Sequence, residues 1–167
     1  MTRANRIYFP RPLEVRPLLA LARRFDQTIL DTADQPLHII AIADTGTPLA
    51  TAIATHCAQM RPGIEVWLSI VNARAPENTI SSPTPSTFGR LRTIVIDNAI
   101  NTGATMEKVL TILRNKKIPV DTIVKMIDYG DAEECRVNDS IKRTFGLDVK
   151  SIFTYDEVGP AFKSKQV

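Results

Sequence analysis

Cysteine and histidine are scarce in this chain, and their scarcity excludes several kinds of site. Cys57 and Cys135 are its two cysteines, too few for a disulfide framework or a cysteine-rich zinc site. His38 and His56 are its two histidines, which argues against a histidine-based metal centre and leaves few groups that titrate near neutral pH. The chemistry of this protein is therefore expected to rest on other residue types.

Long hydrophobic runs are also missing. No apolar stretch approaches the roughly 18 residues that a membrane-spanning helix needs, which excludes an integral helical membrane protein. The first residues lack the apolar core of a secretory signal peptide. From these two absences we expect a cytoplasmic protein without membrane contact.

The composition that remains is that of an ordinary globular domain. Hydrophobic residues make up 44% and charged residues 23% of the 167 residues, which argues against a disordered or fibrous chain. A chain of this length can bury one core and is short for two. Because no internal repeat or linker interrupts it, we expect one domain over residues 1–167.

Positive charge gathers near the N-terminus. The net charge is +3, yet residues 1–25 contain six arginines and a single acid, Glu14. The simpler explanation is a solvated basic face on a first helical segment within residues 1–31. The alternative is a surface that attracts an anion, a nucleic acid or a protein partner.

Hydrophobic patterns and chain breakers predict alternating helices and strands. The predicted helices are 12–31, 48–60, 103–116 and one that ends at Gly146, and the predicted strands are 37–43, 64–71, 93–96, 120–127 and 149–153. Such alternation is typical of an α/β fold, here a single domain with a mainly parallel twisted sheet and helices on both faces. Residues 72–89 are rich in Pro, Ser, Thr and Asn and are predicted to form one long mobile loop.

The most informative segment is a strand-to-helix junction within residues 91–110. An apolar strand ends at Asp97, and Asn101–Thr105 then opens a helix. Small and hydroxyl residues at a helix start expose backbone N–H groups that can cradle a phosphate, and an acid beside them suits sugar hydroxyls. Neither GxxxxGK[ST] nor GxGxxG is present. The simpler alternative is an ordinary turn with a capping Asn or Thr.

Residues 94–105 read IVIDNAINTGAT and resemble the signature of the type I phosphoribosyltransferases: an apolar strand, two acids, a short variable stretch and Thr-Gly-(Gly/Ala)-Thr. Residues 41–50 are similar to that family's first loop. Residues 6–11, 124–128 and 148–158 are similar to segments of its orotate phosphoribosyltransferase branch. The resemblance spans nearly the whole chain and is strong over residues 91–110.

The resemblance implies an enzyme that moves a ribosyl 5′-phosphate from phosphoribosyl pyrophosphate to a nitrogen nucleophile with the help of Mg²⁺. It implies catalytic contacts from Asp97, Asn98 and Arg74, with Asp97 reaching Mg²⁺ through the ligand or water. The other implied roles are binding of the 5′-phosphate by Ala99, Ile100, Asn101, Thr102, Gly103, Ala104 and Thr105, of pyrophosphate by Asp44, Thr45 and Gly46, and of the base by Tyr129. Segment 72–89 would be a mobile lid, and a homodimer or a larger complex is the expected assembly.

Three departures from the family pattern bear on activity. Asn98 stands where the signature has its second acid, and the lid has a single cation, Arg74. Cations in the lid would stabilise the departing pyrophosphate. Residues 128–134 contain several acids and no lysine or arginine, which disfavours a carboxylate base such as orotate.

Three functions therefore stay open. The first is an active phosphoribosyltransferase whose acceptor is not orotate. The second is a non-catalytic protein that binds phosphoribosyl pyrophosphate or a nucleotide for regulation or complex formation. The third is a protein that contacts nucleic acid through its basic N-terminus, for which charge is the only support.

Overall fold

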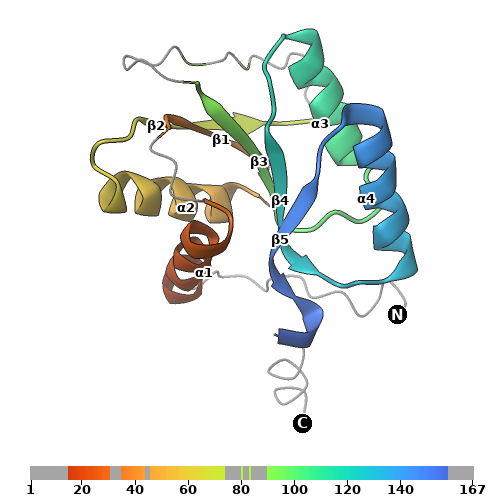
Figure 1. The fold of residues 1–167 in the computed structure, drawn as a ribbon, viewed down its shortest axis with the longest axis horizontal. Coiled ribbons are helices and arrows are strands. Elements are labelled where there is room, and N and C mark those ends of the chain that lie inside the picture. The colour runs from red at the N-terminus through yellow and green to blue at the C-terminus, as the bar shows by residue number, and fades with distance from the viewer. Residues whose placement is uncertain are drawn as a thin grey trace.

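The computed structural model describes residues 15–30, 35–43, 46–73, 80, 83 and 90–157. Within them, helices and strands alternate along the chain as predicted (Figure 1). The helices are α1 (Val15–Thr28), α2 (Thr47–Met60), α3 (Ala104–Asn115) and α4 (Ala132–Phe145), and the strands are β1 (Leu37–Ile42), β2 (Val66–Val71), β3 (Arg92–Asp97), β4 (Thr122–Asp128) and β5 (Val149–Thr154). No described helix is long and apolar enough to cross a membrane.

The described strands form one parallel sheet in the order β2-β1-β3-β4-β5. β1 lies inside the sheet and is buried at every position. A parallel strand that is covered on both faces reads as a continuous apolar run, which explains the pattern of residues 37–43. The predicted fold class is confirmed: this is a single α/β domain with a parallel sheet.

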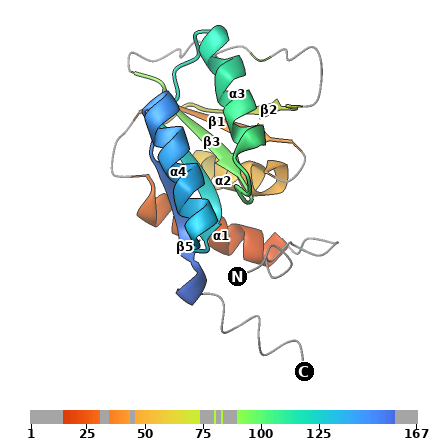
Figure 2. The ribbon, with the colours of Figure 1, turned by 90° about the vertical axis from the view of Figure 1, so that its right-hand side faces the viewer.

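Helices cover both faces of the sheet (Figure 1; Figure 2). α1 and α2 pack on one face, where Phe25 and Ile53 share a core with Ile39 of β1. α3 and α4 pack on the other face, where Val109 shares a second core with Ile40. Successive strand side chains point to opposite faces, so the apolar run of β1 serves both cores. Burial of this apolar surface is the main source of stability.

Element boundaries differ from the predictions by three residues or fewer. α1 ends at Thr28, earlier than predicted: Ile29 N still makes the helical bond to Phe25 O at 2.8 Å, but Leu30 N reaches five residues back to the same oxygen at 3.4 Å. β2 begins at Val66, later than predicted, because Ile64 N donates to Arg61 O at 2.9 Å and closes a turn. Local hydrogen bonds at element ends therefore account for both differences.

Because all the described strand pairs are parallel, the strands end at a common edge of the sheet. We call it the carboxyl edge, formed by the residues that follow Ile42, Asp97, Asp128 and Thr154. Open α/β sheets bind their ligands at this edge. The predicted phosphate loop, pyrophosphate loop and base-binding residue all belong to it.

Candidate functional site

The first loop of the carboxyl edge is built around Gly46. Gly46 N donates to Ile42 O at 2.9 Å, and Gly46 O accepts from Ala50 N at 2.9 Å, so α2 starts directly beyond β1. A Cβ at this position would lie 2.6 Å from Ile96 O and 2.9 Å from Ile42 O, closer than carbon and oxygen atoms pack. Glycine is therefore required, and the start of α2 lies against the end of β3.

Asp97 ends β3 beside that loop. Its side chain is nearly buried, at 6% exposure, and its Oδ1 accepts a hydrogen bond from Asn98 N at 2.7 Å. Asn98 O in turn accepts from Met126 N of β4 at 3.3 Å. These two hydrogen bonds hold the backbone of Asn98, directly after β3, against β4. Asp97 and Asn98 therefore offer a carboxylate and a carboxamide from adjacent positions at the carboxyl edge.

The loop between β3 and α3 ends in a left-handed glycine. Gly103 has a φ of 78°, and its O accepts from Glu107 N at 2.8 Å. The N-cap residue of α3, Gly103, has no side chain that could accept from the first N–H groups of the helix. A Cβ on Gly103 would lie 2.8 Å from Val137 Cγ1 of α4. The loop has the backbone geometry of an anion cradle.

The residues of this loop differ in what they can offer a phosphate. Exposed side chains belong to Thr102, Ala104 and Thr105, half-buried ones to Ala99 and Asn101. Ile100 is 3% exposed and packs in the core beside α3. Ile100 can thus contribute its backbone alone, whereas the Thr102 and Thr105 hydroxyls can also donate hydrogen bonds.

Two tyrosines lie at the carboxyl edge, directly after β4 and β5. The ring centroids of Tyr129 and Tyr155 are 5.8 Å apart, and the ring planes are inclined by 34°. Both side chains are half-buried. Tyr155 is absent from the sequence-predicted site residues, although its place after the last strand is the signal that could have found it. The aromatic pair gives this part of the edge a surface on which a planar base could stack.

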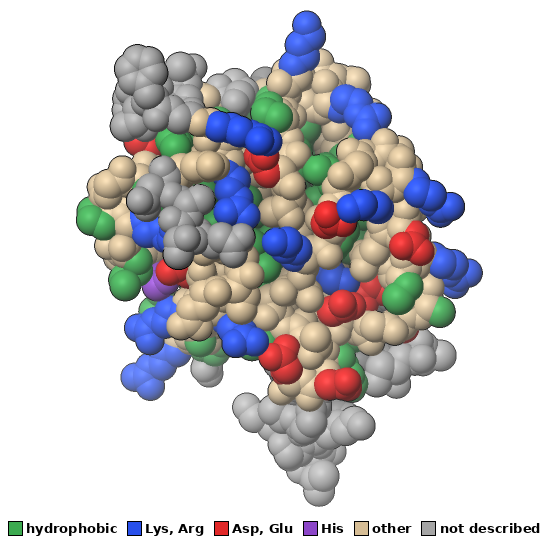
Figure 3. Space-filling model, viewed as in Figure 1, with side chains coloured by type: hydrophobic (Ala, Val, Ile, Leu, Met, Phe, Trp, Pro, Cys, Tyr) green, Lys and Arg blue, Asp and Glu red, His purple; other side chains and the backbone are tan. Residues whose placement is uncertain are grey.

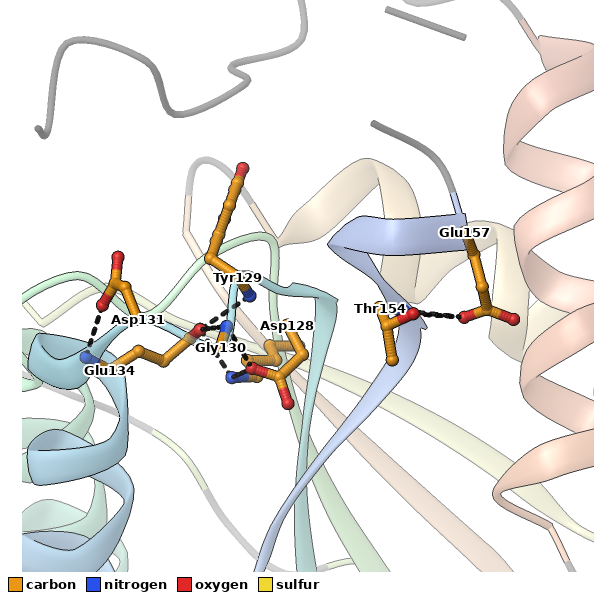
Figure 4. A network of polar contacts seen from close by, with 8 residues as sticks. Asp128, Tyr129, Gly130, Asp131, Glu134, Thr154 and Glu157 are labelled. Atoms are coloured by element: carbon orange, nitrogen blue, oxygen red, sulfur yellow. Dashed lines mark hydrogen bonds and ion pairs between the residues drawn. The ribbon is translucent and has the colours of Figure 1, made fainter. Parts of the chain in front are cut away.

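A buried ion pair holds the loop that carries Tyr129 (Figure 4). Lys125 and Glu134 are each 1% exposed, and Lys125 Nζ lies 2.5 Å from Glu134 Oε1. Glu134 Oε2 accepts from Tyr129 N at 2.7 Å and from Gly130 N at 3.0 Å. Burial raises the pKa of Glu134, and the Lys125 ammonium acts against that rise. Neither residue is among the predicted site residues.

The end of β5 is closed by Glu157. Its Oε2 accepts from Thr154 N at 2.7 Å and from Thr154 Oγ1 at 3.1 Å, and these bonds lower the pKa of Glu157. Its Oε1 accepts from Arg24 of α1 at 3.0 Å, and the Arg24 guanidinium also lies 5.7 Å from the Phe153 ring centroid. One of the N-terminal arginines thus joins α1 to β5.

Charged side chains of both signs are distributed over the face shown in Figure 3. Lysine and arginine side chains lie along α3 and α4, and acidic side chains lie near the end of β5. Arg16 and Arg23 of α1 are exposed. Residues 1–14, which hold the remaining N-terminal arginines, lie outside the described part of the chain, so a nucleic-acid surface there stays a prediction.

Several predicted site residues also lie outside the described ranges. They are Asp44, Thr45, Arg74 and most of segment 72–89. Of that segment, Ala73 and Ile80 are buried in the core shared with α3. The mobile lid and the pyrophosphate contacts of Asp44 and Thr45 therefore stay predictions.

Comparison with known proteins shows the family to which the chain is related. The family model "Phosphoribosyl transferase domain" matches residues 13–159. A hypoxanthine/guanine phosphoribosyltransferase of Methanosalsum zhilinae is 29% identical over 167 residues, covering 90% of this chain and 81% of that protein. The transcriptional regulator GfcR of Methanoculleus marisnigri is 28% identical over 128 residues, covering 75% of this chain. The chain spans 56% of that regulator's length.

Solved structures are similar in fold. An orotate phosphoribosyltransferase of Francisella tularensis has a TM-score of 0.64 at 18% identity, covering 89% of this chain and 72% of that one. The orotate phosphoribosyltransferase of Mycobacterium tuberculosis in complex with phosphoribosyl pyrophosphate has a TM-score of 0.62 at 16% identity, covering 86% and 76%. Identities this low show the fold alone. The family match, however, extends over most of the sequence, and the chain belongs to the phosphoribosyltransferase domain family.

Proposed function

We propose that the carboxyl edge binds phosphoribosyl pyrophosphate and that the protein transfers the phosphoribosyl group to a nitrogen acceptor other than orotate. The close approach of Gly46 to Ile96 O, which precedes Asp97, carries this proposal. This contact places the start of α2 beside Asp97, and the loop that follows Asp97 ends at the start of α3. Neither helix start has a described side-chain cap. The N–H groups of one helix can therefore bind the 5′-phosphate of the ligand and those of the other its pyrophosphate.

Each part of the edge has a role in this proposal. The N–H groups and hydroxyls of residues 102–105 would hold the 5′-phosphate, and the Gly46 loop would hold the pyrophosphate. As the bond from the ribose to pyrophosphate breaks, positive charge develops on the sugar. The Asp97 carboxylate would stabilise that charge and, with Asn98, orient the ribose hydroxyls.

The oxygen donors at the turn fit Mg²⁺ bound together with the ligand. Asp97 offers a carboxylate and Asn98 a carboxamide oxygen, and Mg²⁺ is commonly held by one or two carboxylates plus substrate phosphates and water. Among the described residues, no group of three or more His, Cys, Asp or Glu side chains could hold a metal. When bound, Mg²⁺ supplies positive charge against the departing pyrophosphate.

The loop after β4 disfavours an anionic acceptor. The N–H groups of Tyr129 and Gly130 already donate to Glu134, so they are not available to a carboxylate. The Asp128 side chain, 39% exposed beside them, shares the Lys125 ammonium with Glu134, so two carboxylates face one cation and further negative charge is disfavoured. A neutral base with N–H donors fits this loop better. The purines named for the Methanosalsum relative are of this kind.

A non-catalytic nucleotide-binding protein is the second candidate. Asn98 removes a negative charge that would favour the cationic sugar of the transition state. One relative is, in addition, named a transcriptional regulator. Such a protein would keep the ribose-phosphate pocket and bind phosphoribosyl pyrophosphate or a nucleotide without turnover.

Calorimetry and a pyrophosphate-release assay separate the two candidates. An active transferase binds phosphoribosyl pyrophosphate with Mg²⁺ and releases pyrophosphate with at least one of hypoxanthine, guanine, adenine and uracil. Binding without release supports the second candidate, and absence of binding rejects both.

A pair of glycine variants locates the phosphate site. Gly103→Ala should lose binding, because its Cβ would meet Val137 and the residue has a left-handed backbone. Gly146→Ala is the matched control: its φ is 73° and nothing lies within 4 Å of its Cβ position, at the far end of α4. Equal binding by the two variants would reject the loop at Gly103 as the phosphate site.

A further inference from the structure

Lys125 and Glu134 form a pair of charges inside the protein core. Lys125 stands in β4, where the five neighbouring positions from Thr122 to Ile127 are also buried. Moving an ammonium or a carboxylate out of water costs several kcal/mol for each ion, and hydrophobic residues of similar volume often fill such positions without loss of stability. Stability alone therefore does not account for this pair.

The geometry of Glu134 connects the pair to the loop after β4. Lys125 Nζ binds Glu134 Oε1, which turns Oε2 toward the loop, where it accepts from Tyr129 N at 2.7 Å and Gly130 N at 3.0 Å. Asp131 Oδ1 accepts from Glu134 N at 2.8 Å and caps α4, so the backbone of Glu134 is also fixed. Two successive N–H groups thus reach one oxygen, and Gly130, which has a left-handed φ of 64°, also donates from its N to Asp128 Oδ1 at 3.1 Å.

The orientation of Tyr129 follows from these contacts. Figure 4 shows its backbone N directed to the Glu134 carboxylate and its ring pointing away from the ion pair. The ring lies 5.8 Å from that of Tyr155, at the edge where the base would bind. Glu134 has no such access itself, since it is 1% exposed. It can act on a ligand only through the loop.

We propose that Glu134, oriented by buried Lys125, is a positioning residue that fixes Tyr129 for recognition of the base. This inference rests on the proposed function, because it requires a base at the carboxyl edge. Glu134 contributes to the affinity for a base-bearing ligand and not to the affinity for the ribose phosphate. Replacing Glu134 should therefore weaken binding of a nucleoside monophosphate and leave binding of ribose 5-phosphate unchanged.

Two double variants isolate the hydrogen bonds from the charges. Lys125→Met/Glu134→Leu removes both charges and leaves Tyr129 N without its Glu134 acceptor, while Gly130 N keeps Asp128 Oδ1 at 3.1 Å. Lys125→Met/Glu134→Gln removes the same charges but keeps a carbonyl oxygen that can accept both. Both variants avoid an unpaired buried charge, and thermal unfolding establishes that each is folded. The Gln variant is thus the matched control for the Leu variant.

Amide hydrogen exchange by NMR reads the loop without any ligand. The Tyr129 amide should be protected in wild type and in the Gln variant and should exchange faster in the Leu variant, whereas the Gly130 amide also donates to Asp128 and should change less. Unchanged protection in the Leu variant would overturn the proposal that Glu134 holds this loop.

Calorimetry with ribose 5-phosphate and with GMP, AMP and UMP measures how much the base contributes to affinity. In the Leu variant, the affinity for the tightest of these nucleotides should fall by about tenfold or more, while that for ribose 5-phosphate stays unchanged. The Gln variant should bind both as wild type does. Equal losses for both probes, or an unchanged nucleotide affinity, would overturn the positioning role. If wild type binds neither probe, the proposed function itself fails, and amide exchange still decides whether Glu134 holds the loop.

Discussion

Gly46, Asp97 and Glu134 are each constrained in a different way at the carboxyl edge. Gly46 is constrained by space, because a Cβ there would touch two backbone oxygens. Asp97 is a nearly buried acid with one oxygen bonded to the next N–H. Glu134 accepts from three donors while fully enclosed. Substitutions of Gly46, Asp97 and Glu134 should therefore change stability, affinity for the ribose phosphate and affinity for the base, respectively.

Replacing Gly46 by Ala should destabilise the protein by about 1–3 kcal/mol, the usual cost of forcing an extra carbon into a packed site. The obstructing atoms are the carbonyl oxygens of Ile96 and Ile42, which cannot rotate away as a side chain can. Urea denaturation gives the change in free energy of unfolding. Gly63→Ala is the control, because nothing lies within 4 Å of its Cβ position. Similar losses in both variants would show that the close approach is no constraint.

Asp97→Asn should weaken binding of ribose 5-phosphate more than Asn98→Ala does. Hydrogen bonds from sugar hydroxyls to a charged acceptor are roughly twice as strong as those to a neutral one. The substituted amide oxygen can still accept from Asn98 N, so the turn should keep its shape. Calorimetry on the two variants measures the ranking, and equal losses would reject it. Asn98→Asp should raise turnover only if the protein is an active transferase.

Among the elements, β1 combines a buried position with a titratable side chain. His38 is 0% exposed, and its Nε2 lies 2.8 Å from Ser69 Oγ of β2. Burial lowers the pKa of His38 to about 4. Protonation would place a buried imidazolium charge beside Ser69, where no water can solvate it. The β1–β2 pairing is therefore sensitive to acid.

Acid should destabilise wild type more than His38→Val. Because the native pKa of about 4 lies below the unfolded value of 6.5, the unfolded chain binds the proton first as the pH falls. The stabilising contribution is complete above pH 6.5 and is lost toward pH 4. Its full size is roughly 3 kcal/mol, from 1.36 kcal/mol for each pKa unit. Urea denaturation of both proteins at pH 7 and pH 4.5 measures the difference, and parallel pH dependences would refute it.

For the whole molecule, the strand order decides which loops share a site. The order β2-β1-β3-β4-β5 places the ends of β1, β3 and β4 next to one another. Gly46, Asp97 and Tyr129 thereby meet at one edge although more than thirty residues separate the second from the third. In the proposed function, the acids at the end of β4 and in the loop after it would determine which base this edge accepts.

The intact protein should not use orotate as an acceptor. Orotate is an anion, and burying its carboxylate without a partner would cost several kcal/mol. In the loop after β4, the N–H groups of Tyr129 and Gly130 donate to Glu134, and Asp128 lies beside them. A spectrophotometric assay with orotate, Mg²⁺ and phosphoribosyl pyrophosphate tests this. Turnover near one per second, within the ordinary range of enzymes, would contradict it.

The sequence by itself determined the fold class and the strand-to-helix junction at the predicted phosphate loop. Strands and helices could be predicted because apolar runs and helical periods depend on which faces of an element are buried. The junction at Asp97 and Thr102–Thr105 could be predicted because a strand, a turn and a helix start are all encoded by neighbouring residues. These features require no knowledge of how the elements pack.

Only the tertiary structure decided the contacts between elements. The approach of Gly46 to Ile96, the pairing of Tyr129 with Tyr155 and the burial of Lys125 against Glu134 depend on how helices return against the sheet. The residues next to Lys125 in the sequence do not indicate that its partner is Glu134. The physical reason is that sequence pattern reports burial and backbone conformation along one element, whereas distances between side chains of different elements are set by packing.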